Sequence, residues 1–166
     1  MRIFFRLFLL SLLTACQREE TPPPPMQAAS SATPLQTDAR QFRSLTWLEG
    51  MWRGTQSDTA PFFERYQFRD DSTISTLTYA DSLGRQVVDS GLIRLRDGIV
   101  MSGDSARGYV LTALDSMTAH FEPRGAAVNA FTWQRTSESS WTATLTWRDA
   151  SGQPIERVYV MRLLKR

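Results

Sequence analysis

The sequence predicts an all-β protein, in which about ten antiparallel strands form an up-and-down barrel after a short helical turn. First, apolar and polar residues alternate along short runs beyond Phe42, as they do in half-buried strands. Second, the turns between these runs contain Gly or Ser and are too short for a crossover helix, so neighbouring strands pair antiparallel. Because about ten such strands either close or leave two exposed edges, we expect a barrel and not an open sandwich.

Residues 1–15 have the three parts of a secretory signal peptide. Arg2 and Arg6 supply the positive start, an apolar run covers 7–13, and small residues lead to Cys16. The run is too short to span about 30 Å of hydrocarbon. The four residues that end at Cys16 resemble the bacterial lipobox, which implies that the leader is removed and that the cysteine is acylated. The alternative is an ordinary cleavable signal in which Cys16 is an incidental thiol.

The residue after Cys16 bears on the location of the protein. Gln17 stands where an aspartate commonly retains lipoproteins in the inner membrane of Gram-negative bacteria, so we expect a lipid-anchored envelope protein of the outer membrane. Residues 17–20 also resemble the short tetrads of surface-exported lipoproteins in Bacteroidota-like bacteria, which implies surface exposure; the alternative is the polar start of a tether. Several acyl chains, at about 0.8 kcal/mol per buried methylene, anchor a domain without spanning the membrane.

Residues 16–41 are expected to form a disordered tether. Prolines at 22–25 and 34 stand among Ser, Ala, Thr and Gln, with almost no large apolar side chains. Such a composition cannot build a core, and the proline run is a stiff spacer of about 3.1 Å per residue. We therefore expect the folded domain to cover 42–166.

Charge and residue counts exclude several functions. The chain has 19 Lys and Arg against 17 Asp and Glu, and loss of Arg2 and Arg6 with the leader makes the two counts equal at 17. A neutral chain lacks the basic excess that nucleic-acid binding needs. The single cysteine excludes an internal disulfide and a multi-cysteine metal cluster. We expect no metal and no cofactor.

The domain begins with a helical turn expected at 44–49, where Ser44 is the cap. The expected strands are 52–57, 62–69, 73–79, 87–95, 99–101, 109–114, 117–121, 129–135, 141–148 and 155–164. Alternation is clearest in 141–148, where Trp141, Ala143, Leu145 and Trp147 share the inward face. Residues 103–108 lack the Lys-Ser/Thr end of a phosphate loop and are expected to be a hairpin loop.

The segment 44–54 looks like the opening of calycin-type barrels, in which a short helix closes one end and a Gly-x-Trp enters the first strand. In lipocalins and their relatives, the tryptophan packs beneath an Arg or Lys of the last strand. The resemblance therefore implies that Gly50, Trp52 and Arg162 close the barrel, with Arg157 as the alternative cation. A cation over an indole face is a favourable contact.

A closer resemblance is to a bacterial calycin-like family of unknown function, which opens with Leu-x-Trp-Leu-x-Gly-x-Trp, as 45–52 do here. Its later Phe-Glu-(Asn)-Pro segment matches 121–123 with one residue missing. Its His-Asp-Phe-Pro stretch is Gly-Ala-Ala-Val at 125–128. The haem-binding nitrobindin relatives have a similar opening and ligate iron through a histidine near the C-terminus, but the only histidine here is His120, which falls on the outward phase of its strand.

Inward-facing residues of the expected strands predict the lining of an interior site. The residues are Glu64, Tyr66, Phe68, Phe131, Trp133, Leu145 and Trp147. A carboxylate facing a barrel interior is costly unless it is paired or protonated, so Glu64 either meets an inward arginine or orients a ligand. The aromatic residues are core if the barrel is filled and lining if it is hollow; a barrel of about ten strands encloses more volume than side chains readily fill.

The sequence thus predicts a lipid-anchored barrel that binds a small apolar or amphiphilic ligand at the cell envelope, without catalysis. The alternative is a structural lipoprotein with a filled core that contacts another envelope protein. With His120 as the only histidine, no Ser-His-Asp triad is expected. A hydrolase or isomerase that uses Glu64 as acid or base ranks last.

Overall fold

The computed structural model describes residues 32–57, 59–104 and 107–164. The expected signal peptide, Cys16 and most of the expected tether lie outside these residues. No helix in the described ranges is both long and apolar enough to cross a membrane.

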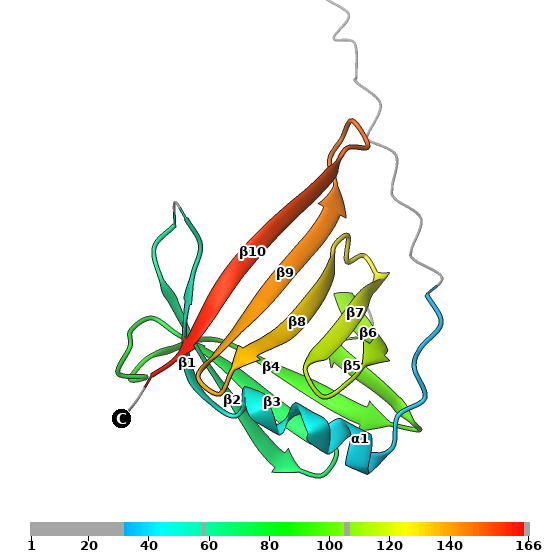
Figure 1. Cartoon of the computed structure of the whole chain (residues 1–166), viewed down its shortest axis with the longest axis horizontal. Helices are drawn as coiled ribbons and strands as arrows, with labels where there is room; N and C mark the ends of the chain where they lie inside the picture. Colours follow the sequence, from blue (N-terminus) through cyan, green and yellow to red (C-terminus); the bar gives the residue numbers. More distant parts are fainter. Residues whose placement is uncertain (1–31, 58, 105–106, 165–166) are drawn as a thin grey trace, which may run out of the picture.

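Ten strands form one closed antiparallel barrel, in which each strand pairs with its neighbours in sequence and β1 pairs with β10 (Figure 1). This confirms the predicted fold class. The strands are β1 Gly50–Thr55, β2 Phe62–Asp70, β3 Thr73–Tyr79, β4 Val87–Arg96, β5 Ile99–Gly103, β6 Arg107–Leu114, β7 Thr118–Gly125, β8 Ala130–Ser137, β9 Ser140–Arg148 and β10 Pro154–Leu163.

Short turns connect consecutive strands of the barrel, and the turn between β4 and β5 is an example. Arg96 pairs with Ile99, so β4 and β5 are joined by the two residues Asp97 and Gly98, with φ of 52° and 76°. Positive φ at both central residues is the geometry of a tight hairpin turn whose twist matches that of the strands. A two-residue turn is too short for the crossover that parallel strands require, so the strands that it joins pair antiparallel.

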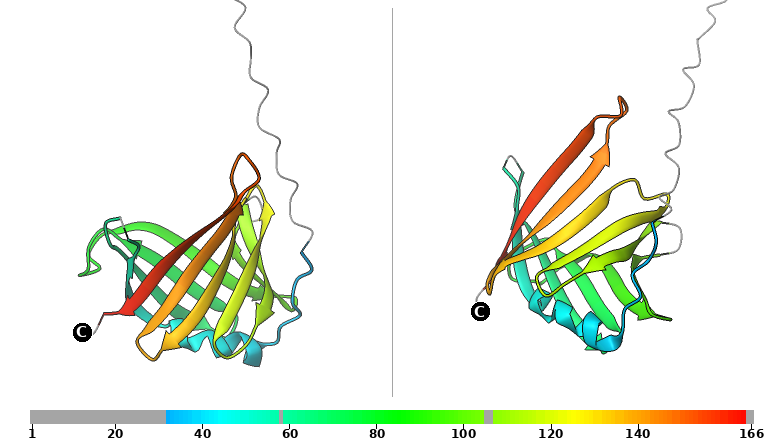
Figure 2. Two further views of the ribbon diagram at one scale, coloured as in Figure 1. Left: turned by 45° about the horizontal axis from the view of Figure 1, so that its top comes forward. Right: turned by 45° about the vertical axis from the view of Figure 1, so that its right-hand side comes forward.

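A short helical segment lies across one end of the barrel (Figures 1 and 2). It consists of α1 Ala39–Arg43 and the 3-10 helix η1 Ser44–Leu48. Phe42, Leu45 and Leu48 have no exposed surface and fill the barrel end. The helical segment is longer than the turn expected at 44–49, because a capping box at Asp38 begins a helix one turn earlier.

The ordered domain also begins before the boundary expected at Phe42. The backbone N–H of Leu35 donates to the carbonyl of Leu111 at 2.9 Å, and that of Thr37 donates to Gly98 at 2.8 Å. These hydrogen bonds attach the last part of the expected tether to β6 and to the turn between β4 and β5, and Leu35 packs against the core. Composition does not reveal this contact, since the partners are backbone groups far away in the sequence.

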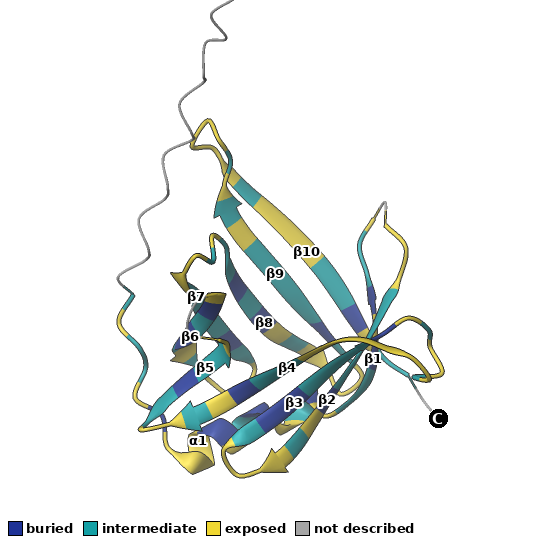
Figure 3. Cartoon of the chain, turned by 180° about the vertical axis from the view of Figure 1, so that it is seen from behind, coloured by how far each residue is buried: buried dark blue, intermediate teal, exposed yellow. Residues whose placement is uncertain are grey.

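The core is concentrated at the end that the helices cover (Figure 3). Its fully buried side chains include those of Ile74, Val100, Leu111 and Phe121. At the other end, β9 and β10 pair up to Arg148 and Pro154, beyond the last β8–β9 pair at Ala130, and project from the barrel (Figure 2). The barrel is therefore packed at one end and open at the other.

Candidate functional site

Gly50 and Trp52 lie at the closed end. The φ of Gly50 is +140°, and a Cβ there would lie 2.6 Å from Cδ1 of Leu163, so a glycine is required where η1 turns into β1. Trp52 is 2% exposed. Its indole N–H donates to the carbonyl of Leu48 at 2.7 Å, and its ring meets that of Trp141 edge-on at 5.8 Å.

The structure corrects the expected contact between Arg162 and Trp52. Arg162 is exposed and pairs with Arg53 on the outward phase, whereas Trp52 pairs with Leu163. The cation is one residue out of phase with the indole that it was expected to cover. Arg157, the alternative, lies toward the open end, with its guanidinium 5.4 Å from the centre of the Trp147 ring.

The open half of the barrel contains a cavity of about 430 Å³. Seven of its twelve lining residues are aromatic. The lining consists of Phe62, Glu64, Tyr66, Tyr109, Asn129, Phe131, Trp133, Trp141, Ala143, Leu145, Tyr159 and Met161. These residues come from the five strands β2, β6, β8, β9 and β10 and from the connection between β7 and β8.

The inner part of the cavity is a cluster of edge-to-face aromatic rings. The Tyr66 ring lies 5.8 Å from that of Trp133 and 5.7 Å from that of Trp141, with interplanar angles of 85°. Trp133 and Trp141 also meet each other at 5.9 Å. Trp141 Nε1 is buried and has no hydrogen-bond partner among the described residues. This cluster separates the cavity from the packed end.

Glu64 is the only acidic residue in the lining of the cavity. The hydroxyl of Tyr66 donates to its Oε2 at 2.8 Å. No described lysine or arginine forms an ion pair with Glu64, so the expected pairing with an inward arginine is not formed and a tyrosine is the partner instead. Burial raises the pKa of Glu64, while the Tyr66 hydrogen bond partly offsets this and the charge of Asp89 adds to the rise.

The cavity mouth combines aromatic rings with polar groups. The rings of Phe62 and Tyr159 meet edge-on at 5.5 Å. On the other side, the Tyr109 hydroxyl donates to Asn129 Oδ1 at 3.1 Å. A methyl group on Gly54 would overlap the Phe62 ring. A glycine at this position therefore allows the Phe62 ring to lie against the cavity wall.

Five of the seven predicted lining residues meet at this cavity: Glu64, Tyr66, Phe131, Trp133 and Leu145. Phe68 and Trp147 do not line it. The Phe68 ring lies 5.6 Å from Phe42 at the closed end, and Trp147 lies beyond Leu145, beneath Arg157. Both residues have the inward phase expected of them but lie at the wrong height along the barrel.

The predicted site omits the other seven lining residues, although Trp141 is among the aromatic residues that the alternation assigns to the interior. Trp141 and Ala143 lie on the recognised inward face of 141–148, and Tyr109, Tyr159 and Met161 alternate within expected strands, so a signal was present for these. Phe62 shares its phase with Glu64. Asn129 lies just before β8 and shares its phase with Phe131 and Trp133 in the expected strand 129–135, but its polar side chain does not suggest a wall of an apolar cavity.

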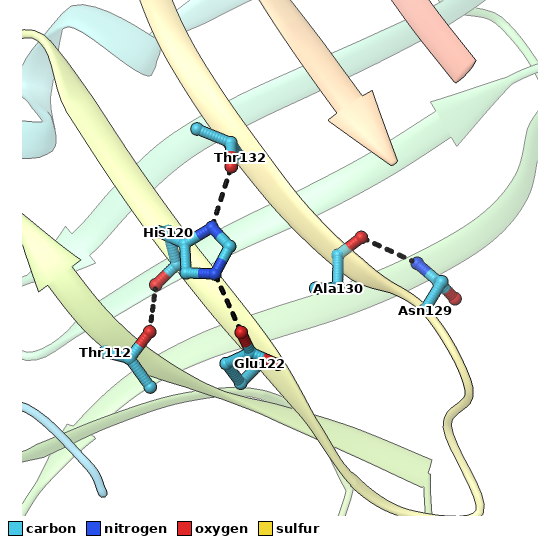
Figure 4. Close-up of polar contacts among 6 residues, drawn as sticks. All are labelled: Thr112, His120, Glu122, Asn129, Ala130 and Thr132. Carbon is cyan, nitrogen blue, oxygen red and sulfur yellow. Dashed lines mark hydrogen bonds and ion pairs between the residues drawn. The ribbon is translucent and has the colours of Figure 1, made fainter. Parts of the chain in front are cut away.

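His120 lies on the outer wall of β7, apart from the cavity (Figure 4). Its Nδ1 is 2.7 Å from Thr132 Oγ1, and its Nε2 is 3.0 Å from Glu122 Oε1. The side chain is 32% exposed, so it is partly buried, where the outward phase alone suggests full exposure. Both ring nitrogens are engaged by side chains of the barrel surface.

No protein-family model and no curated protein matches this chain. Two solved structures are among those that resemble it. One is EF1p2_mFAP2b bound to DFHBI, with 12% identity over 75% of this chain and 99% of that chain and a TM-score of 0.37. The other is a redesigned beta barrel, with 12% identity over 78% of this chain and 99% of that chain and a TM-score of 0.36. Likeness at this level carries no argument about function.

Proposed function

We propose that this chain is a lipid-anchored envelope protein that binds a small apolar or amphiphilic ligand in the open half of its barrel. The observation that carries the proposal is the cavity of about 430 Å³ with seven aromatic residues in its lining. Its size lies within the range of about 300–1,000 Å³ that is usual for small-molecule sites. A few polar groups among apolar walls are also typical of such sites.

The walls of the cavity support binding because they are held in place before a ligand arrives. Most lining side chains stand on strands with two hydrogen-bonded neighbours, and the rings at the inner end brace one another. A preorganised site loses less conformational entropy on binding. Apolar surface that enters the cavity is then stabilised by about 25 cal/mol per Å² removed from water.

The test uses N-phenyl-1-naphthylamine, a neutral dye that fluoresces in apolar surroundings. We expect the purified protein to bind it. Leu145→Trp should weaken binding about tenfold or more, because the larger side chain occupies space that the ligand would fill. Leu83→Trp adds the same side chain at a position that is 70% exposed and should leave binding unchanged.

Two outcomes would contradict ligand binding. One is the absence of dye binding by the unmodified protein. The other is that Leu145→Trp lowers the free energy of unfolding by about 1–3 kcal/mol, as overpacking of a filled core does.

The lipid anchor is a separate part of the proposal and rests on the sequence that ends at Cys16. In cells given a fatty-acid probe, the unmodified protein should be labelled and should fractionate with the outer membrane. Cys16→Ser should abolish labelling and the normal cleavage. Equal labelling of the two proteins would refute the anchor.

One observation favours the alternative, a protein that contacts an envelope partner. Leu83, in the connection between β3 and β4, and Val87 and Val88, at the start of β4, are 70%, 49% and 58% exposed. If the dye does not bind and replacement of these three residues by serine abolishes chemical cross-linking of the protein to an envelope protein, this alternative replaces the first proposal.

A further inference from the structure

We propose that the cavity selects organic cations, and that its ligand places a protonated amine or quaternary ammonium group beside Glu64 among the aromatic walls. This inference rests on the proposed function, since it requires that the cavity binds a ligand. It adds the chemical class of the ligand.

The first argument is the half of the Glu64 carboxylate that is open to the cavity. Its Oε2 accepts the Tyr66 hydroxyl at 2.8 Å, whereas Oε1 is not among the buried atoms that lack a partner and faces a cavity that Glu64 lines. A carboxylate that borders an apolar cavity loses part of its hydration and requires compensation. A ligand in the cavity can supply a donor or a positive charge to this oxygen.

The second argument is the composition of the walls. Aromatic faces carry negative electrostatic potential and attract cations within about 6 Å of the ring centre. Tyr66 and Trp133 line the cavity with Glu64, and Phe62 and Tyr159 stand at its mouth. Aromatic rings around a carboxylate suit an alkylated ammonium group, whose apolar substituents contact the rings while its charge is balanced by the carboxylate.

The third argument is the balance of charge around Glu64. On β3 it faces Thr78, which in turn pairs with Asp89 on β4, and the negative charge of Asp89 acts on Glu64. On β10, Arg157 lies over Trp147 and donates to the Tyr159 hydroxyl at 3.5 Å, and it forms no ion pair with Glu64. An anionic group deep in the cavity would meet a like charge.

Burial raises the pKa of Glu64, and a bound cation would oppose that rise. Cation binding therefore favours loss of a proton from Glu64. The affinity for a cation should increase as the pH rises through the pKa of this carboxyl group, whereas the affinity for a neutral ligand should not change.

The experiment compares three probes with the same alkyl chain as competitors of N-phenyl-1-naphthylamine: octyltrimethylammonium, octanol and octanoate. We expect octyltrimethylammonium to displace the dye at a concentration about tenfold lower than octanoate. Glu64→Gln should abolish this preference and its dependence on pH. Glu122→Gln is the matched control, because Glu122 is a partly buried glutamate on the outer wall, and it should keep the preference.

The outcomes separate this inference from the proposed function. If the dye binds but octanoate competes as well as or better than the cation, cation selectivity is overturned and ligand binding stands; loss of octanoate binding in Arg157→Gln would then assign the site to anions. If the dye does not bind, both proposals fail. The ranking of the three probes in the unmodified protein decides the question even if Glu64→Gln does not fold.

Discussion

Trp52 closes the barrel through a hydrogen bond and not through a cation. Its N–H reaches the Leu48 carbonyl, a group at the end of η1. The carbonyls in the last turn of a helix lack partners within the helix, so the indole satisfies one of them. The same ring packs against Trp141, which lines the cavity. One side chain thus connects the helix, the first strand and the inner wall of the site.

Trp52→Phe should lower the free energy of unfolding by about 1–3 kcal/mol, because it leaves the Leu48 carbonyl buried without a donor. Arg162→Ala should change it by less than about 0.5 kcal/mol, since Arg162 is exposed. Urea denaturation of the two variants measures both values. A large loss in Arg162→Ala would restore the closure by a cation that the sequence resemblance implies.

The raised pKa of Glu64 predicts a pH dependence of stability. Because the folded state holds this proton more tightly than the unfolded state, whose pKa is near 4.5, stability from this group is greatest below pH 4.5 and falls as the pH rises through the folded pKa. Glu64→Gln should therefore gain stability relative to the unmodified protein between pH 4.5 and pH 8. Denaturation midpoints that keep a constant difference over this range would contradict the burial of an ionisable Glu64.

At the scale of the element, the helical segment is short, and the hydrogen bonds at its N-terminus stabilise it. The Asp38 carboxylate accepts the N–H of Gln41 at 2.7 Å, and the Gln41 side chain accepts the N–H of Asp38 at 2.8 Å. These two bonds satisfy N–H groups that have no partner inside a helix. They position Phe42 over Phe68 at the packed end.

Asp38→Ala should cost about 0.5–2 kcal/mol of stability, as the loss of a helix cap does. Asp38→Asn keeps an acceptor at the same place and should cost much less. Thermal unfolding of the two variants gives the comparison. Equal losses would mean that the negative charge matters and the hydrogen bond does not.

At the scale of the whole molecule, the barrel divides into a filled half and a hollow half. The helices cover one end, and their side chains occupy its interior. Among the described residues no helix covers the other end, and β9 and β10 extend past it. The filled-core and hollow-barrel interpretations of the sequence each describe one half.

Replacing an alanine by leucine in each half of the barrel tests whether one half is filled and the other hollow. Ala119 has no exposed surface and lies in the packed core, whereas Ala143 lines the cavity. Ala119→Leu should lower the free energy of unfolding by about 1–3 kcal/mol through overpacking. Ala143→Leu should cost much less and should weaken dye binding. If both variants lose the same stability, the open half is packed as well.

Much of the fold can be predicted from the chain because strand alternation is a local property. Each side chain of a strand points to the face opposite its neighbours, so the spacing of Tyr66, Trp133 and Leu145 predicts that they lie inside the barrel. The turn at Asp97 and Gly98 is equally local, since its backbone geometry depends on two residues. Strand number, antiparallel order and most of the lining follow from such signals.

Height along the barrel and the phase of β10 required the three-dimensional structure. Phe68 and Trp147 have the inward phase, but the stagger between strands, which depends on pairing across the whole barrel, places them at opposite ends. On β10, apolar residues occupy both phases, as Val158 and Val160 alternate with Tyr159 and Met161. Alternation therefore could not show that Arg162 points outward; the pairing with β1 does.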